Sequence, residues 1–271
     1  MRKWVRLALT IYPVLGPLGH RAKKHRRHPE RKTQVECFED VKRTAAKANK
    51  RGFHAVFFEE GKENLPKGQV LFTCNHVSDF DPRAALCVID RPIAFLSKKE
   101  VRKMPIFGWI VDYLGSTFID RNDLRSEIKA FRAIKSQLET EKELSYFVFP
   151  EGTRSQGPEF NLAPYHAGTF KIAIHNQLPI CPVVRYFPER VFNQHYHYHK
   201  YPIQVRYLKP IYPEEYDERT NQEIAQKVHD ETLAALEERK KKDPRLVKEL
   251  NGYSDKKLNK VLHYNKVTKK S

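Results

Sequence analysis

Several sequence features that mark common kinds of enzyme or binding site are missing from this chain. None of the four cysteines, Cys37, Cys74, Cys87 and Cys181, is paired at C-x-x-C spacing, so neither a zinc clip nor a dithiol redox motif is indicated. No Gly-x-Ser-x-Gly elbow occurs, which argues against a serine acyl-enzyme. No apolar run reaches the about 20 residues that a membrane-spanning helix needs. Reduced, mostly buried thiols in a cytosolic compartment fit these absences.

What the chain does have is enough apolar surface for a folded body. Its 271 residues are 40% apolar and 11% aromatic, which suits one large domain or two small ones rather than disorder. The formal charge is +17. Residues 1–32 hold ten Lys or Arg and one acid, residues 239–271 hold twelve and three, and the body between them is nearly neutral. Basic ends attract nucleic acid or anionic lipid, but a nucleic-acid enzyme more often has a basic body as well.

The N-terminus resembles a signal peptide in layout, with a basic start and an apolar run from Leu7 to Leu18, but no small-residue cleavage site follows. Pro13 and Pro17 interrupt the run, and a basic stretch, His20 to His28, comes after it. We expect an interfacial helix or shallow hairpin on the membrane surface. The alternative is a helix docked on the folded domain.

Strand and helix patterns alternate along the rest of the chain. The strands are expected at 53–58, 70–74, 93–96, 117–119, 146–149, 180–186 and 203–208, and the helices at 33–50, from Pro82, at 104–114, 124–138, 170–175 and 220–242. This predicts an α/β fold, with a central mixed β-sheet flanked by helices and an N-terminal membrane-interfacial helical segment. We divide the chain into a basic interfacial segment (1–32), a catalytic domain (33–242) and a basic C-terminal tail (243–271).

The first candidate site is His76, which lies between an apolar strand and a helix start in Asn75-His76-Val77-Ser78-Asp79-Phe80-Asp81. A carboxylate on one ring nitrogen would leave the other free to accept a proton. Spacing alone leaves both Asp79 and Asp81 open as that carboxylate, and Asp81 could instead cap the helix. Cys74 offers a Cys–His nucleophile, but a buried, small apolar role suits it better.

Two later segments could bind an anion. Phe149-Pro150-Glu151-Gly152-Thr153-Arg154-Ser155 ends a strand in a turn, where Gly152 permits close backbone approach and Arg154 can grip a phosphate. Gly115 to Arg121 delivers a second arginine, and Lys98 follows another strand. His76, Lys98, Arg121 and Arg154 could therefore meet at the strand ends of one sheet, where open α/β sheets bind ligands.

Four ordered blocks now resemble a known family. The pattern Asn75-His76-x4-Asp81, then 115–121, then 149–155, then Leu178-Pro179-Ile180-Cys181-Pro182-Val183-Val184 is similar to the glycerolipid acyltransferases, which include the 1-acylglycerol-3-phosphate acyltransferases. The match covers about 70–213. The resemblance implies that His76 is the general base and Asp81 orients it. It also implies an acceptor site built from Arg121, Glu151, Gly152, Thr153 and Arg154, with Lys98 as a phosphate partner, and no metal or prosthetic group.

The implied reaction transfers a fatty acyl group from acyl-CoA or acyl carrier protein to the hydroxyl of lysophosphatidic acid, which gives phosphatidic acid in phospholipid biosynthesis. The same chemistry on glycerol-3-phosphate or another lysophospholipid stays open. The basic ends would hold the enzyme on anionic lipid at the cytoplasmic face of the cell membrane, as a peripheral or monotopic protein.

Two other interpretations are weaker. His195, His197 and His199 alternate with tyrosines and could share one face of a strand, but no cysteine or carboxylate nearby completes a metal site. A non-enzymatic nucleic-acid-binding protein rests only on the high isoelectric point, and we expect no nucleic-acid partner.

Overall fold

One sheet organises the molecule. The computed structural model describes residues 3–120, 122–155, 162–192 and 198–259. Seven strands lie in the order β1-β7-β6-β2-β5-β3-β4. In chain order they are β1 (Ala55–Glu60), β2 (Leu71–Cys74), β3 (Ile93–Lys98), β4 (Thr117–Ile119), β5 (Ser145–Val148), β6 (Ile180–Tyr186) and β7 (Tyr201–Tyr207).

Five adjacent strands, β6, β2, β5, β3 and β4, are parallel to one another, and β7 is antiparallel to β6. The edge strand β1 is parallel to β7. The carboxyl ends of β2, β5, β3 and β4 therefore meet at one edge of the sheet, where open α/β sheets bind ligands. Every residue of β2, β5 and β6 is buried, as expected for parallel strands covered on both faces.

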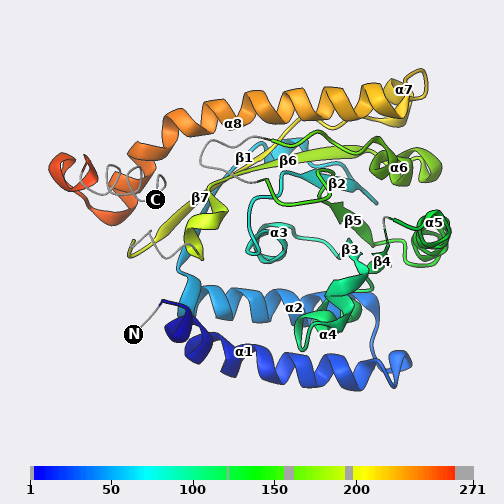
Figure 1. Ribbon diagram of the computed structural model, residues 1–271, viewed down its shortest axis with the longest axis horizontal. Coiled ribbons are helices and arrows are strands. Elements are labelled where there is room, and N and C mark those ends of the chain that lie inside the picture. Colours follow the sequence, from blue (N-terminus) through cyan, green and yellow to red (C-terminus); the bar gives the residue numbers. More distant parts are fainter. Residues whose placement is uncertain (1–2, 121, 156–161, 193–197, 260–271) are drawn as a thin grey trace.

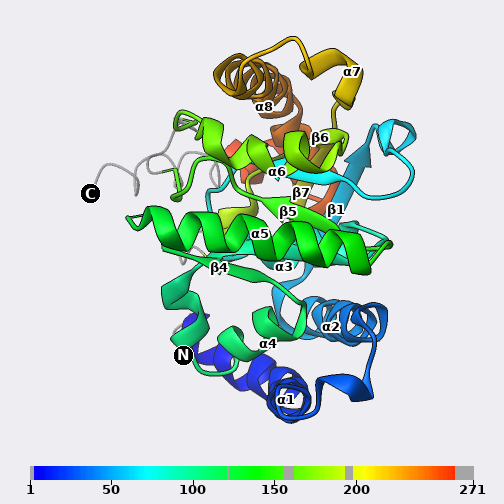
Figure 2. The same cartoon turned by 90° about the vertical axis from the view of Figure 1, so that its right-hand side faces the viewer.

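Helices cover both faces of the sheet. They are α1 (Lys3–His25), α2 (Gln34–Ala48), α3 (Asp81–Val88), α4 (Phe107–Tyr113), α5 (Leu124–Thr140), α6 (Lys171–Asn176), α7 (Pro213–Tyr216) and α8 (Asn221–Asn251). One apolar core joins the sheet to α1, α2, α3 and α4, and a second joins its other face to α5, α6 and α8. Figures 1 and 2 show α8 and α6 on one side and α3, α2 and α1 on the other. The predicted mixed sheet flanked by helices is confirmed.

Local sequence explains where the main helices begin. Thr33 and Glu36 form a reciprocal capping box at α2, and Thr220 and Glu223 form another at α8. Each pair satisfies two backbone N–H groups that a helix start would leave without partners. Asp123 caps α5 by accepting from the backbone N–H of Arg125.

The N-terminal segment is one continuous helix rather than a hairpin. Pro13 and Pro17 both lie inside α1, and both are exposed. Proline in a helix interior removes a hydrogen bond and costs about 3 kcal/mol. Packing offsets this cost, because Ile11, Leu18 and Ala22 are buried in the core. In Figure 1, α1 forms the outermost layer, against α2 and α4.

The last helix extends past its predicted end at Lys242. Pro244 lies inside α8, which continues to Asn251 and ends at Gly252 in the left-handed conformation. Burial of Asp243 and Val247 explains the extension, since tertiary packing can hold a helix together across a proline. The first nine residues of the expected tail are thus part of α8. No helix within the described residues is both long and apolar enough to cross a membrane.

Candidate functional site

The loop between β2 and α3 carries His76 and is fixed at its first residue. Asn75 is fully buried. Its side-chain amide donates to the backbone carbonyl of Arg185 at 2.8 Å and accepts from the backbone N–H of Arg185 at 2.8 Å. Because β2 already pairs with β6 up to Cys74, the Asn75 amide extends that pairing by one step. This double contact sets the direction in which the chain leaves the sheet.

His76 and Asp81 are directly hydrogen-bonded. His76 Nδ1 lies 2.8 Å from Asp81 Oδ2, and the Asp81 side chain is fully buried while His76 is 19% exposed. In the neutral ring, a carboxylate at Nδ1 selects the tautomer in which Nδ1 carries the proton and Nε2 has a free lone pair. No described residue hydrogen-bonds Nε2. The geometry suits a general base that faces outward from the sheet.

Asp81 is the first residue of α3, but its side chain does not cap that helix as the sequence suggested. The carboxylate points back into the loop, where Oδ2 also accepts from the backbone N–H groups of Val77 and Ser78, each at 2.8 Å. One oxygen therefore receives three donors. These bonds hold the loop and the ring in a single arrangement.

Glu151 supports His76 from the neighbouring strand. Its carboxylate accepts the backbone N–H of His76 at 2.6 Å, the hydroxyl of Ser155, and the backbone N–H of Ala163 at 3.3 Å. Burial raises the pKa of the Glu151 carboxyl above its ordinary value, although these donors oppose the rise. Phe149 stacks on the His76 ring with centroids 4.3 Å apart. Glu151 thus binds the loop that carries His76, and its place in the acceptor site, which the family resemblance implies, stays a prediction.

Asp79, the rival partner for His76, pairs with Arg154 instead. Arg154 Nη1 donates to Asp79 Oδ2 at 2.7 Å, and the two side chains are 53% and 71% exposed. Exposed ion pairs contribute little, typically about 0–1 kcal/mol. A substrate phosphate could therefore displace Asp79 from Arg154 at small cost.

Three of the remaining predicted residues, Lys98, Gly152 and Thr153, follow the carboxyl ends of β3 and β5. Gly152 is buried with φ of +70°, a conformation that favours glycine over any side chain. Thr153 is exposed beside it, and Lys98 is exposed at the end of β3, two strands from β2. Arg121 lies outside the described residues.

Cys74 does not provide a nucleophile. It is fully buried at the end of β2, and burial raises the pKa of its thiol to about 12. A thiol with such a pKa is almost entirely protonated at neutral pH, whereas the thiolate is the reactive form. The Cys–His alternative is therefore disfavoured.

Sequence inspection missed two charged residues beside the site. Arg185, on β6, is fully buried next to Asp81 and Cys74. Arg83, on α3, donates to the backbone carbonyl of Asp79 at 2.8 Å and lies over the Phe107 ring at 4.5 Å. The signal for Arg185 was present, because a lone cation near the end of a continuous apolar strand must find a buried partner.

No group of three His, Cys, Asp or Glu side chains suited to a metal occurs in the described part of the chain. His199 is exposed, and His195 and His197 lie outside the described residues.

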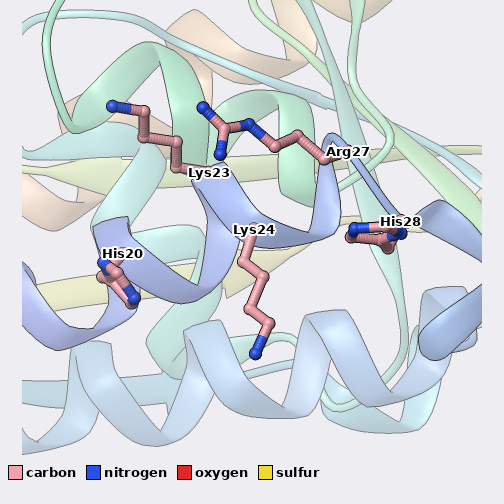
Figure 3. A pocket seen from close by; sticks show the side chains of 5 residues that line it. All are labelled: His20, Lys23, Lys24, Arg27 and His28. Carbon is pink, nitrogen blue, oxygen red and sulfur yellow. The ribbon is translucent and has the colours of Figure 1, made fainter.

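A separate group of cations lies at the end of α1. Figure 3 shows it, with Lys23 and Arg27 extending to one side of the helix and Lys24 toward the other. It also includes His20 and His28. We call Lys23, Lys24 and Arg27 the α1 cations. All three are exposed, and no described carboxylate forms an ion pair with them.

Comparisons with known proteins agree with the four blocks. Residues 56–185 match the model of the Acyltransferase family. The 1-acyl-sn-glycerol-3-phosphate acyltransferase of Saccharomyces cerevisiae is 30% identical over 179 residues, which cover 66% of this chain and 59% of the relative. The enzyme of the same name from Cocos nucifera is 28% identical over 171 residues, or 63% and 54% of the two chains. The chain thus spans somewhat over half the length of these two relatives.

A bacterial relative and a solved structure are also similar to this chain. The 1-acyl-sn-glycerol-3-phosphate acyltransferase of Salmonella typhimurium is 31% identical over 116 residues, 43% of this chain and 46% of that one. The crystal structure of the 1-acyl-sn-glycerophosphate (LPA) acyltransferase PlsC from Thermotoga maritima superposes with a TM-score of 0.63 at 23% identity, and covers 89% of this chain and 98% of that one. The superposition shows a shared fold.

Proposed function

We propose that this chain, whose residues 56–185 match the model of the Acyltransferase family, is a glycerolipid acyltransferase that transfers a fatty acyl group from an acyl thioester to the hydroxyl of 1-acyl-glycerol-3-phosphate. The observation that carries the proposal is the 2.8 Å contact between His76 Nδ1 and Asp81 Oδ2. This contact leaves Nε2 available as the base. The product is phosphatidic acid, and the free thiol of the donor is released.

The proposed reaction proceeds by direct attack. The acceptor hydroxyl attacks the thioester carbonyl carbon while His76 Nε2 takes the hydroxyl proton. The tetrahedral intermediate then collapses, the carbon–sulfur bond breaks, and the imidazolium returns its proton to the leaving thiolate. General-base help of this kind is typically worth about 10²–10⁴-fold in rate. Asp81 holds the ring in the required tautomer throughout.

We assign the acceptor phosphate to Arg154, with Lys98 at the end of β3 and Arg121, which follows β4 in the sequence, as further cations. The Asp79–Arg154 pair is exposed and easily exchanged, so the phosphate takes the place of the Asp79 carboxylate. Gly152 and Thr153 form the turn that brings the acceptor close to the backbone. Glu151 acts indirectly, through the His76 backbone that it binds.

We further propose that α1 holds the enzyme on an anionic membrane surface, at the cytoplasmic face, as a peripheral or monotopic protein. Leu9 and Tyr12 are 65% and 61% exposed on α1, and the α1 cations follow about two to three helical turns beyond the last proline. Lys23 and Lys24 lie in the last turn of α1, and Arg27 lies two residues past its end. Apolar side chains that enter the lipid, together with cations at the headgroups, are the two contributions that hold an interfacial helix.

An acyl-transfer assay with the purified full-length chain tests the reaction. Lysophosphatidic acid, glycerol-3-phosphate and lysophosphatidylcholine are each offered with acyl-CoA and with acyl carrier protein, and the products are identified by mass spectrometry. We expect phosphatidic acid from lysophosphatidic acid with at least one donor. Transfer only to another acceptor would change the substrate, and absence of transfer in every arm would refute the proposal.

A further inference from the structure

Arg185 is a fully buried cation directly behind the His76–Asp81 pair. Its side chain is 0% exposed, as is that of Asp81. Arg185 Nε donates to Cys74 Sγ at 3.0 Å, and Nη1 donates to the backbone carbonyl of Asp81. The guanidinium carbon lies 5.5 Å from the ring centroids of both Phe147 and Phe149. The contacts fix the guanidinium against the first residue of α3.

The charged ends of Arg185 and Asp81 face each other without touching. Arg185 Nη2 lies 4.0 Å from Asp81 Oδ1. Neither of these atoms has a hydrogen-bond partner within the described residues, whereas Asp81 Oδ2 has three. A buried charge without an opposite charge is strongly unfavourable. Each group is therefore the main compensation for the other.

Arg185 is the cation suited to this position because guanidinium cannot lose its proton in a protein. A buried carboxylate 2.8 Å from His76 would by itself favour the imidazolium form of the ring. An imidazolium cannot accept a proton from the acceptor. A permanent positive charge on the opposite side of Asp81 counteracts that pull.

We propose that Arg185 is a positioning residue that holds Asp81 in place and offsets its charge, so that His76 stays unprotonated and ready to act as a base. The inference rests on the proposed role of His76. It assigns to the end of β6, directly after the fourth block, a part in the chemistry that motif spacing does not reveal.

The other charged groups around His76 leave this role to Arg185. Glu151 accepts the His76 backbone N–H, and burial raises the pKa of its carboxyl. Burial also raises the pKa of Cys74 to about 12, which keeps it a neutral thiol. Asp79 is exposed and already paired with Arg154, so solvent screens both of them.

The test measures protonation of His76 without requiring turnover. Diethyl pyrocarbonate modifies only the unprotonated imidazole, so the extent of His76 modification against pH, read by peptide mass spectrometry, reports the fraction of neutral ring. In R185M we expect the modification midpoint to rise by about one pH unit, since loss of a nearby cation favours the charged imidazole. In R185K, which keeps the charge, we expect the midpoint to stay within about 0.3 unit of the wild type.

The double variant R190M/D243L is the matched control, because it removes another fully buried arginine together with its carboxylate partner. Its midpoint should equal that of the wild type. If R185M does not fold, R185Q takes its place. A rise of one pH unit in the midpoint of R185K, which keeps the charge, would overturn the proposal. An unchanged midpoint in folded R185M would overturn it too.

Activity provides a second readout. The acidic limb of the kcat/KM profile should move to higher pH in R185M, in parallel with the modification midpoint. A uniform loss of kcat at all pH values, with an unchanged midpoint, would show that Arg185 is merely structural. A shifted midpoint in a protein with no acyl-transfer activity would support the electrostatic role of Arg185 while refuting the proposed reaction.

Discussion

The charges at the carboxyl edge of the sheet and the charges at the end of α1 are arranged in opposite ways. Asp81, Glu151 and Arg185 are each no more than 2% exposed. Asp81 and Glu151 contact His76, and Arg185 contacts Asp81. The α1 cations are exposed and have no described ion-pair partner. A buried charge depends on the specific groups that it contacts, whereas water and salt screen an exposed charge.

This difference determines how each region should respond to substitution. In the buried region, removal of one group should have a large effect that depends on a single partner. In the exposed region, removal of one cation should have a small effect, and several such effects should add. The buried Arg190–Asp243 pair, on the α8 side of the molecule, provides an example of the first kind away from the site.

His76→Ala should give the largest effect on activity. We expect kcat/KM to fall by about 10²–10⁴-fold, because the variant lacks the proposed base, while the circular dichroism spectrum stays unchanged. His175→Ala, which replaces an exposed histidine of α6, is the matched control and should keep wild-type activity. Full acyl-transfer activity in folded His76→Ala would contradict the proposed mechanism.

Arg190→Met should give the largest effect on stability. Arg190 and Asp243 form two parallel hydrogen bonds of 3.0 and 2.8 Å and are nearly fully buried. The single variant leaves Asp243 as an uncompensated buried charge, so we expect a loss of about 3–5 kcal/mol in the free energy of unfolding. Urea denaturation measures it. Addition of Asp243→Leu should restore most of the loss, and no recovery would mean that packing rather than charge carries the effect.

The contrast between buried and exposed charge was only partly visible in the sequence. Hydrophobic periodicity placed β6 at 180–186 and the start of α5 at Leu124, as the structure has them. These are local properties. The order of the strands, with β1 beside β7 rather than β2, depends on contacts between residues far apart in the chain, which periodicity does not encode.

The same limit applies to the site. The predicted strand ends placed His76, Lys98, Arg121 and Arg154 at one sheet edge, but spacing alone left both Asp79 and Asp81 open as the His76 partner. The structure separates them through the turn before α3, which directs Asp81 toward the ring and Asp79 toward Arg154. Arg185 contacts Asp81 across 104 residues of sequence, and no local pattern could relate the two.

Glu151→Gln should give a smaller, pH-dependent change in stability. Burial raises the pKa of Glu151 above its ordinary 4.5, so the folded state holds this proton more tightly than the unfolded state does. The stabilisation is complete below the unfolded pKa and is lost as pH rises through the folded pKa. Glutamine does not titrate. The wild-type Tm minus the variant Tm, measured by scanning calorimetry, should therefore be larger at pH 4 than at pH 7.

The opposite trend for Glu151→Gln, with the wild type gaining on the variant as pH rises, would mean that the hydrogen bonds from His76, Ser155 and Ala163 outweigh burial. The buried region would then stabilise the charged form of Glu151.

Replacement of the α1 cations should give the smallest effect per residue. Each Lys or Arg near an anionic surface contributes about 1 kcal/mol at most, so K23Q/K24Q/R27Q should weaken binding to anionic vesicles by up to about 100-fold at low salt. Sedimentation with vesicles of phosphatidylglycerol and phosphatidylcholine measures this.

The control is the triple variant K129Q/R132Q/K135Q, which removes three exposed cations from α5 and has the same net charge as the α1 variant. If position matters, only the α1 variant should lose binding, and the loss should disappear at high salt. Equal losses would mean that net charge alone attracts the protein, and α1 would then have no special role at the membrane.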